Sequence, residues 1–146
     1  MAVNSSGKKL YQLHENSGIW TASPPDHGVW TLLDRNDATK AIAASTADEF
    51  CKLHHGGQIF AHSAAGEAWK LIDDSGAAAV VAPGIYLYSW HQDGTIWRYS
   101  GTPGVWEQLD THPETVGVVG NKDGKVWQLR RHRNSQARFL SCERRS

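Results

Sequence analysis

The sequence predicts an all-β chain assembled from a repeated unit of four short antiparallel strands. Two observations lead to this fold class. The 146 residues include 7 tryptophans and 14 glycines, a composition typical of short strands joined by tight turns. Strand-like segments also recur in a fixed order about every 40 residues, which is the mark of a repeat architecture.

The first strand of the unit alternates residues between two faces and ends on a histidine in three of its four copies. The copies are LYQLH from Leu10, FCKLH from Phe50, LYSWH from Leu87 and VWQLR from Val126. We expect His14, His54 and His91 to be partly exposed residues that serve the turn after each strand. Cys51 replaces an aromatic residue of the other copies and is predicted to be a buried thiol.

The second strand follows a glycine-containing turn, whose glycine permits a positive φ in a tight hairpin. It carries an isoleucine followed by a large aromatic residue, and these pairs end at Trp20, Phe60 and Trp97. Each unit is a small sheet with an apolar face that it cannot bury alone. The isoleucine and aromatic residue of each pair are therefore predicted to lie between adjacent sheets.

The third strand begins with tryptophan and ends with aspartate, and the fourth is short and rich in small apolar residues. We expect the three aspartates, Asp34, Asp73 and Asp110, to cap the turns that follow them. The fourth strands are centred near Ile42, Val80 and Val118. After the third copy the sequence holds a first strand, KVWQLR, and a candidate second strand, ARFLS.

These elements predict a single repeat domain over residues 1–146. The repeats span approximately 9–48, 49–85 and 86–123, with a partial fourth at 124–146. Four-stranded units of this length predict a β-propeller of three blades plus a partial fourth. A β-trefoil, which has three units, is the alternative.

The segments LYQLHENSGIWTAS and LYSWHQDGTIWRYSGTPGVWEQLD resemble tectonin and tachylectin-type propeller repeats. The resemblance covers about Lys9 to Leu129 and is best in the third repeat. It implies a non-enzymatic β-propeller lectin that binds carbohydrate or lipopolysaccharide. Propellers of this kind have five or more blades. This chain therefore needs a small closed ring, a homo-oligomer that closes the ring, or further residues of a longer protein.

Composition excludes several function classes. The formal net charge is zero, which argues against general binding to nucleic acid or to a membrane surface. The basic run from Arg130 to Ser146 is interpreted as a solvated terminal segment. No apolar run is long enough for membrane insertion, and no secretory signal is visible. Localisation therefore stays open between secreted and cytoplasmic.

Catalytic and metal sites are not predicted. The sequence lacks a nucleophile elbow, and the histidines His54, His55 and His62 have no dependable metal-ligand spacing. No cofactor is expected. Sugar binding needs less chemistry, because an aromatic ring and a few polar groups suffice. The predicted ligand-binding residues are Trp97, Arg98, Tyr99, Asp93, Trp106, Asn16, Trp20 and Trp30.

The main functional hypothesis is therefore a lectin-like module with equivalent glycan sites on neighbouring repeats. Repeat two is expected to carry a weak site or none, with only Trp69 and His62. Arg98 and Tyr99 lie past their hairpin and are expected to be exposed. The alternative from another class is a non-catalytic protein-interaction scaffold.

Overall fold

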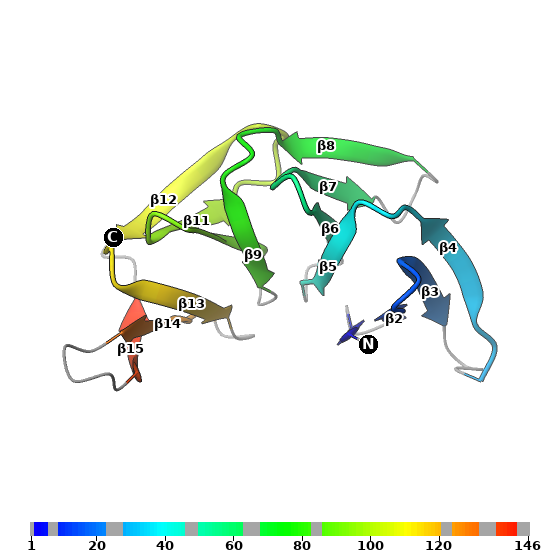
Figure 1. Cartoon of the computed structure of the whole chain (residues 1–146), viewed down its shortest axis with the longest axis horizontal. Helices are drawn as coiled ribbons and strands as arrows, with labels where there is room; N and C mark the ends of the chain where they lie inside the picture. Colours follow the sequence, from blue (N-terminus) through cyan, green and yellow to red (C-terminus); the bar gives the residue numbers. More distant parts are fainter. Residues whose placement is uncertain are drawn as a thin grey trace.

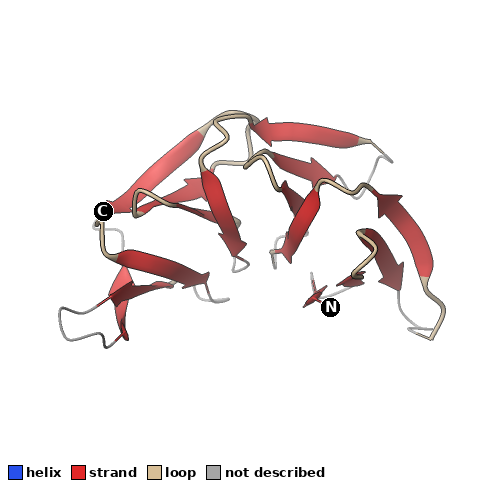
Figure 2. Ribbon diagram, in the orientation of Figure 1, coloured by secondary structure: helices blue, strands red, loops and turns tan. Residues whose placement is uncertain are grey.

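The computed structural model describes residues 2–5, 9–22, 28–45, 50–62, 68–82, 86–120, 124–131 and 137–142 (Figure 1). All regular structure in these ranges is strand (Figure 2), so the all-β prediction is confirmed. Within the same ranges, no helix that is long and apolar enough to cross a membrane occurs. Residues 23–27 and much of the basic run from Arg130 to Ser146 lie outside the described residues.

The first two sheets take up the N-terminal half of the chain and have four antiparallel strands each. The first consists of β1 (Ala2–Ser5), β2 (Leu10–Leu13), β3 (Gly18–Ala22) and β4 (Thr31–Arg35). The second consists of β5 (Thr39–Ala44), β6 (Phe50–His54), β7 (Ile59–His62) and β8 (Trp69–Asp73). Strands pair in chain order in both.

The third and fourth sheets follow the same order, but the described part of the fourth has only three strands. The third sheet consists of β9 (Ala78–Ala82), β10 (Tyr88–His91), β11 (Thr95–Tyr99) and β12 (Trp106–Thr111). The fourth consists of β13 (Thr115–Gly120), β14 (Val126–Arg131) and β15 (Ala137–Cys142). The candidate strand ARFLS is therefore confirmed as part of β15.

The sheets stand side by side in an arc (Figure 1). Strands β5, β9 and β13 lie on the inner side of this arc, and β4, β8 and β12 lie on its outer side. Neighbouring inner strands contact one another from β1 to β5, from β5 to β9 and from β9 to β13. The first and fourth sheets form the two ends of the arc.

The predicted unit is offset from the sheets by one strand. We expected each small apolar strand to belong with the three strands before it, and this was wrong. Strand β5 pairs with β6, β9 with β10 and β13 with β14, so each small strand opens the next sheet. A sequence period has no intrinsic starting point, and only backbone hydrogen bonding assigns a strand to a sheet.

The hydrophobic core of the described residues divides into three clusters, and each cluster fills the joint between two neighbouring sheets. At the first joint, Tyr11 and Ile19 pack against Ile42, Ala44 and Phe50. The second joint has residues of the second sheet around Leu53 and Ile59, and residues of the third around Leu87 and Tyr99. The third joint packs Tyr88 and Ile96 against Val118 and Val126. The apolar face of each sheet is thus covered by its neighbour, as predicted.

The isoleucine–aromatic pairs divide between two environments. Ile19, Ile59 and Ile96 are each 0% exposed in the three joints, which confirms the prediction for the isoleucines. The aromatic residues are only half-buried and lie against the histidines of their own hairpins. The ring centroids are 5.9 Å apart for His14 and Trp20, 4.5 Å for His54 and Phe60, and 5.8 Å for His91 and Trp97.

The three strand-ending aspartates do not all cap turns. Asp73 does, because its Oδ1 accepts a hydrogen bond of 3.0 Å from the backbone N–H of Ser75. Asp34 and Asp110 instead reach across the joint to the next sheet, where they pair with Lys52 at 2.5 Å and Arg130 at 3.0 Å. In the third sheet Ser89 stands at the position of Lys52, and a serine side chain is too short and carries no charge to form this pair.

In the hairpin turns after β2, β6 and β10, we predicted that a glycine has the positive φ. In the first turn the residue with positive φ is Ser17, at 62°, and not Gly18. In the equivalent turns the same position is occupied by Gly57 and Gly94. The glycine prediction holds for the second and third turns and is wrong for the first.

Candidate functional site

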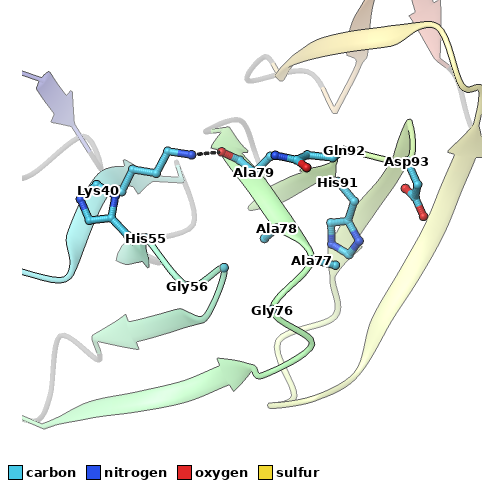
Figure 3. Close-up of a pocket in the computed structure, with 11 residues that line it drawn as sticks. Lys40, His55, Gly56, Gly76, Ala77, Ala78, Ala79, His91, Gln92 and Asp93 are labelled. Carbon is cyan, nitrogen blue, oxygen red and sulfur yellow. Dashed lines mark hydrogen bonds between the residues drawn. The ribbon is translucent and has the colours of Figure 1, made fainter.

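A pocket of about 370 Å³ lies at the joint between the second and third sheets (Figure 3). We call it the joint pocket. It is lined by Lys40 of β5, the turn residues 55–57, residues 76–79 and residues 91–93. The lining therefore comes from two hairpin turns, from the connection between the two sheets and from both inner strands.

The two sides of the joint pocket carry different charges. Figure 3 shows Lys40 and His55 on one side of β9, and His91, Gln92 and Asp93 on the other. The Lys40 ammonium donates a hydrogen bond of 3.0 Å to the carbonyl oxygen of Ala79. This bond ties β5 to the edge strand β9 and holds a positive charge at the pocket.

Small residues bring the backbone to the pocket surface. Gly57 has a φ of +84°, and a Cβ at this position would lie 2.3 Å from the carbonyl oxygen of Gly76. A side chain cannot be accommodated in so short a space, so the turn after β6 can lie against the connection before β9 only with glycine here. Ala77, Ala78 and Ala79 continue the lining with methyl groups, which leave polar backbone atoms close to the surface.

Asp93 is held in a fixed position at the mouth of its turn. Its Oδ1 accepts hydrogen bonds from the Thr95 hydroxyl at 2.6 Å and from the Thr95 backbone N–H at 2.9 Å. These bonds stabilise the charged carboxylate and lower the pKa of Asp93 below its ordinary value. The side of the pocket opposite Lys40 therefore carries a negative charge near neutral pH.

His91 is the half-buried member of the same side. Burial lowers the pKa of its imidazole, and this effect outweighs the opposing influence of Asp73 and Asp93. The ring is consequently neutral near pH 7 and lies against Trp97, at an angle of 29° between the two rings. A neutral imidazole can donate or accept a hydrogen bond.

The predicted ligand-binding residues of the third repeat are only partly brought together. Among them, Asp93 lines the joint pocket. Trp97 is half-buried, and its indole N–H donates to the Thr95 hydroxyl at 2.9 Å. Arg98 is also half-buried, paired with Glu107 and placed over the ring of Tyr86 at 4.9 Å.

Tyr99 and Trp106 contribute to the packing of the second joint. Tyr99 is 7% exposed and belongs to the core cluster, so the expectation that it is exposed was wrong. Strand alternation is the reason, because Tyr99 lies across from Leu87 on the face that contacts the second sheet. Trp106 packs on the same cluster and donates its indole N–H to the carbonyl oxygen of Ile72 at 3.0 Å.

The predicted residues of the first repeat lie away from the joint pocket, in the first sheet and its turns. Asn16 caps its own turn by accepting a hydrogen bond of 3.1 Å from the Gly18 N–H. Trp20 is half-buried against His14, and Trp30 is half-buried just before β4. In the second repeat, the rings of His62 and Trp69 are in edge contact, 5.0 Å apart. A ligand-binding role for the eight predicted residues stays a prediction.

Sequence reasoning missed Lys40, His55 and Gly76 as members of one site. His55 was considered for metal binding, and within the described ranges no group of three or more His, Cys, Asp or Glu residues has a metal-binding arrangement. Lys40 lies in β5, the strand that the sequence analysis assigned to the wrong sheet. The useful signal was the recurrence of hairpin turns, because the equivalent turns at residues 55–57 and 91–93 of neighbouring sheets both line this pocket.

Comparison with known proteins identifies the architecture. No protein-family model and no curated protein sequence matches the chain. PorZ, a surface component of the type-IX secretion system of Porphyromonas gingivalis, matches 94% of this chain and 20% of its own length. The TM-score is 0.67 at 14% identity. A chain of the mitotic checkpoint complex matches 87% of this chain and 44% of its own length, with a TM-score of 0.68 at 14% identity.

YCF48 bound to the D1 peptide is a third similar structure. It matches 94% of this chain and 48% of its own length, with a TM-score of 0.59 at 14% identity. These three structures are β-propeller proteins, and the blades of a propeller are four-stranded sheets arranged around a centre. The chain has a β-propeller fold.

The sheets are therefore blades, and the propeller prediction is confirmed. The β-trefoil alternative does not fit an arc of four separate sheets. The chain spans less than half the length of each of the three similar proteins. Likeness at this level of identity shows the fold alone, so the tectonin and tachylectin type stays a prediction.

Proposed function

We propose that this chain is a non-catalytic protein-interaction module that binds a short segment of a partner protein in the joint pocket. Two similar propellers support a role in protein recognition, since one is bound to a peptide and another belongs to a multiprotein complex. This reading is the scaffold alternative, which the comparisons favour over the lectin reading.

The observation that carries the proposal is the chemistry of the joint pocket. The Lys40 ammonium, with His55 beside it, stands on one side of the pocket, and the Asp93 carboxylate stands on the other, with polar backbone between them. An extended peptide offers the matching groups, because it has N–H and C=O groups at short intervals. We expect the preferred segment to place an acidic side chain near Lys40 and a hydrogen-bond donor near Asp93.

The lining of the pocket supports binding over catalysis. Its residues include no serine, threonine or cysteine, so no side-chain nucleophile of these types stands beside His55 or His91. The volume of about 370 Å³ is sufficient for two or three side chains of a peptide and is at the small end of ligand pockets.

Selection from a displayed peptide library on the purified chain tests the proposal. A selected peptide is then synthesised, and its affinity is measured by calorimetry. Lys40→Glu is expected to weaken binding about tenfold, because it reverses a charge at the pocket. The matched control is Lys70→Glu, which makes the same exchange at an exposed position of β8 outside the pocket.

The proposal predicts that Lys70→Glu leaves affinity almost unchanged. Equal losses for both variants would mean that only net charge matters and would remove the pocket from the proposal. Failure to select any peptide, while the chain is folded by circular dichroism, would argue against peptide recognition.

Carbohydrate binding is the second candidate, and one observation favours it. A rigid carboxylate on Asp93 and a half-buried indole of Trp97 belong to the same hairpin, beside the pocket. This pairing of an aromatic face with a fixed acceptor suits a pyranose ring. A glycan array with Asp93→Ala as the variant tests it. Tyr99→Ala is unsuitable, because truncation of this buried ring is expected to cost about 3–4 kcal/mol of stability.

A further inference from the structure

The three joints inside the chain use the same two surfaces. Each blade presents one face to the blade before it, which we call its preceding face. It presents the other face to the blade after it, which we call its following face. Phe50, Leu87 and Val126 are equivalent first-strand residues on the preceding face, and all three are buried. Tyr11, Cys51 and Tyr88 are equivalent residues on the following face and are also buried.

The following face of the fourth blade has two exposed apolar side chains among its described residues. Val119 and Trp127 are cross-strand partners in β13 and β14, with exposures of 51% and 40%. Their counterparts in the second blade are Ala43 and Cys51, which pair in the same way and are both 0% exposed. A pair that is fully covered in an inner blade is therefore open to solvent at this end of the arc.

The preceding face of the first blade is the complementary open surface. Leu10 stands at the position of Phe50, Leu87 and Val126, and it is half-buried. Trp30 stands at the position of Trp106, which in the third blade donates a hydrogen bond to the blade before it. The first blade thus carries a joint-forming face that no other described blade of the chain covers.

We propose that the following face of the fourth blade binds the preceding face of the first blade of a second copy of this chain. Within the chain, a following face always packs on a preceding face, so the two exposed faces are complementary by the repeat itself. Two such head-to-tail joints close a ring of two chains, each contributing four blades. A ring of eight blades lies at the upper end of the usual propeller range.

The polar residues at the two open faces also match. Two of the three inner joints pair an aspartate of the outer strand with a cation of the next blade, as in Asp34 with Lys52 and Asp110 with Arg130. The fourth blade, as described, has no outer strand to carry such an aspartate. Correspondingly, the first blade has Gln12 at the position of Lys52. Gln12 is already hydrogen-bonded to His14 at 3.2 Å, so the joint buries no lysine without its carboxylate.

Molar mass by light scattering on a sizing column tests the proposal directly. The expected mass is twice the 16.1 kDa of one chain. On dilution below the dissociation constant of the dimer, the mass should fall to that of one chain. Val119→Asp places a charge in the apolar joint and is expected to weaken dimerisation about a hundredfold. The matched control is Val105→Asp, because Val105 is 52% exposed and lies in the turn before β12.

A mass of one chain at all concentrations would overturn the proposal and would leave these faces for another protein or for further residues of a longer chain. An open series of larger oligomers would also overturn it, because two head-to-tail joints between two copies leave no free face. These outcomes depend on the unmodified chain, so they decide the question even if Val119→Asp does not fold.

Mixing two variants distinguishes a head-to-tail joint from a tail-to-tail joint. Val119→Asp damages one face, and Leu10→Asp damages the other. Each variant alone is expected to be monomeric, while the mixture forms a heterodimer with one intact joint. If Leu10→Asp dimerises like the unmodified chain, the fourth blades bind each other and the proposal is wrong. Leu71→Asp, on the outer strand β8, is the control for a charge at an exposed leucine.

Discussion

The Lys52 ammonium lies 2.5 Å from the Asp34 carboxylate, across the joint between the first and second blades. Lys52 is almost completely buried, whereas the Asp34 side chain keeps 21% of its surface exposed. The ammonium also lies 4.3 Å from the centre of the Trp69 ring. The positive charge therefore has two stabilising neighbours, one from each blade.

This asymmetry predicts that the two partners are not equivalent in a mutation experiment. Asp34→Ala leaves a buried ammonium without its carboxylate and is expected to cost about 3 kcal/mol. Lys52→Met removes the charge, keeps most of the volume and leaves a partly solvated carboxylate, at a cost of about 1 kcal/mol. Urea unfolding followed by circular dichroism measures both. The reverse order would show that Lys52 is stabilised mainly by Trp69.

Two glycines with similar backbone angles are predicted to differ in their tolerance of alanine. Gly94 and Gly101 have φ values of +88° and +92°. A Cβ on Gly94 would lie 1.9 Å from the carbonyl oxygen of His112, whereas a Cβ on Gly101 would meet nothing within 4 Å. Gly101→Ala is expected to cost about 1–2 kcal/mol for backbone strain alone.

Gly94→Ala carries the same strain and a clash in addition, so we expect a cost of roughly twice that amount. The comparison of unfolding midpoints for the two variants isolates the contact between the turn after β10 and the connection after β12. Equal losses would mean that this contact relaxes without cost.

Stability is predicted to fall as pH decreases below neutrality. Burial lowers the pKa of both His54 and His91 from the ordinary value of 6.5; Lys52 also lowers that of His54, while Asp34 opposes it. The unfolded chain therefore binds protons at a higher pH than the folded chain. The contribution of these histidines is complete above 6.5 and is lost as pH falls through the window between 6.5 and their folded pKa values.

Urea midpoints measured from about pH 7.5 to about pH 5.5 test this expectation. His54→Gln and His91→Gln should each reduce the slope of the urea midpoint against pH, because glutamine does not titrate. His112→Gln, at a partly exposed histidine in the connection after β12, provides the comparison. An unchanged slope in both His54→Gln and His91→Gln would contradict the assignment.

The indole N–H groups of two tryptophans are expected to contribute differently to the free energy of unfolding. Trp106 donates across the second joint to Ile72, whereas Trp97 donates to Thr95 two residues away in its own strand. Trp106→Phe leaves a carbonyl oxygen of the preceding blade without this donor and is expected to cost about 1–2 kcal/mol. Trp97→Phe is expected to cost less, because the Thr95 hydroxyl can turn to another partner. Thermal unfolding of the two variants measures the difference.

Much of the fold could be predicted from the sequence because the repeat constrains it strongly. The recurrence of Ile19, Ile59 and Ile96 before an aromatic residue identified the centre of each joint. The assignment of Thr39–Ala44 to the wrong sheet arose because periodicity does not determine which strands share hydrogen bonds. The exposure of Tyr99 was misjudged because position after a hairpin says less than the alternation of side chains along β11.

The joint pocket was beyond sequence reasoning for a different reason. Asp93 was predicted as a ligand-binding residue, but Lys40 and His55 belong to the neighbouring blade, and neither differs from its neighbours in a way that marks it as part of the same site. They meet because Gly57 allows one turn to lie against the next connection, which places two blades at a particular separation. Such a site depends on the packing of whole blades and leaves no local motif.

The one-strand offset between repeat and blade has a consequence for how such a chain can grow. The final strand of each 40-residue unit belongs to the blade that follows. A tandem duplication of the unit would therefore add a blade that shares one unit with the blade before it. Such a unit is joined to its neighbour by backbone hydrogen bonds, which do not depend on the identity of the side chains. A unit that runs from β2 to β5 therefore links two blades in two ways, through the continuous backbone and through the hydrogen bonds between β5 and β6.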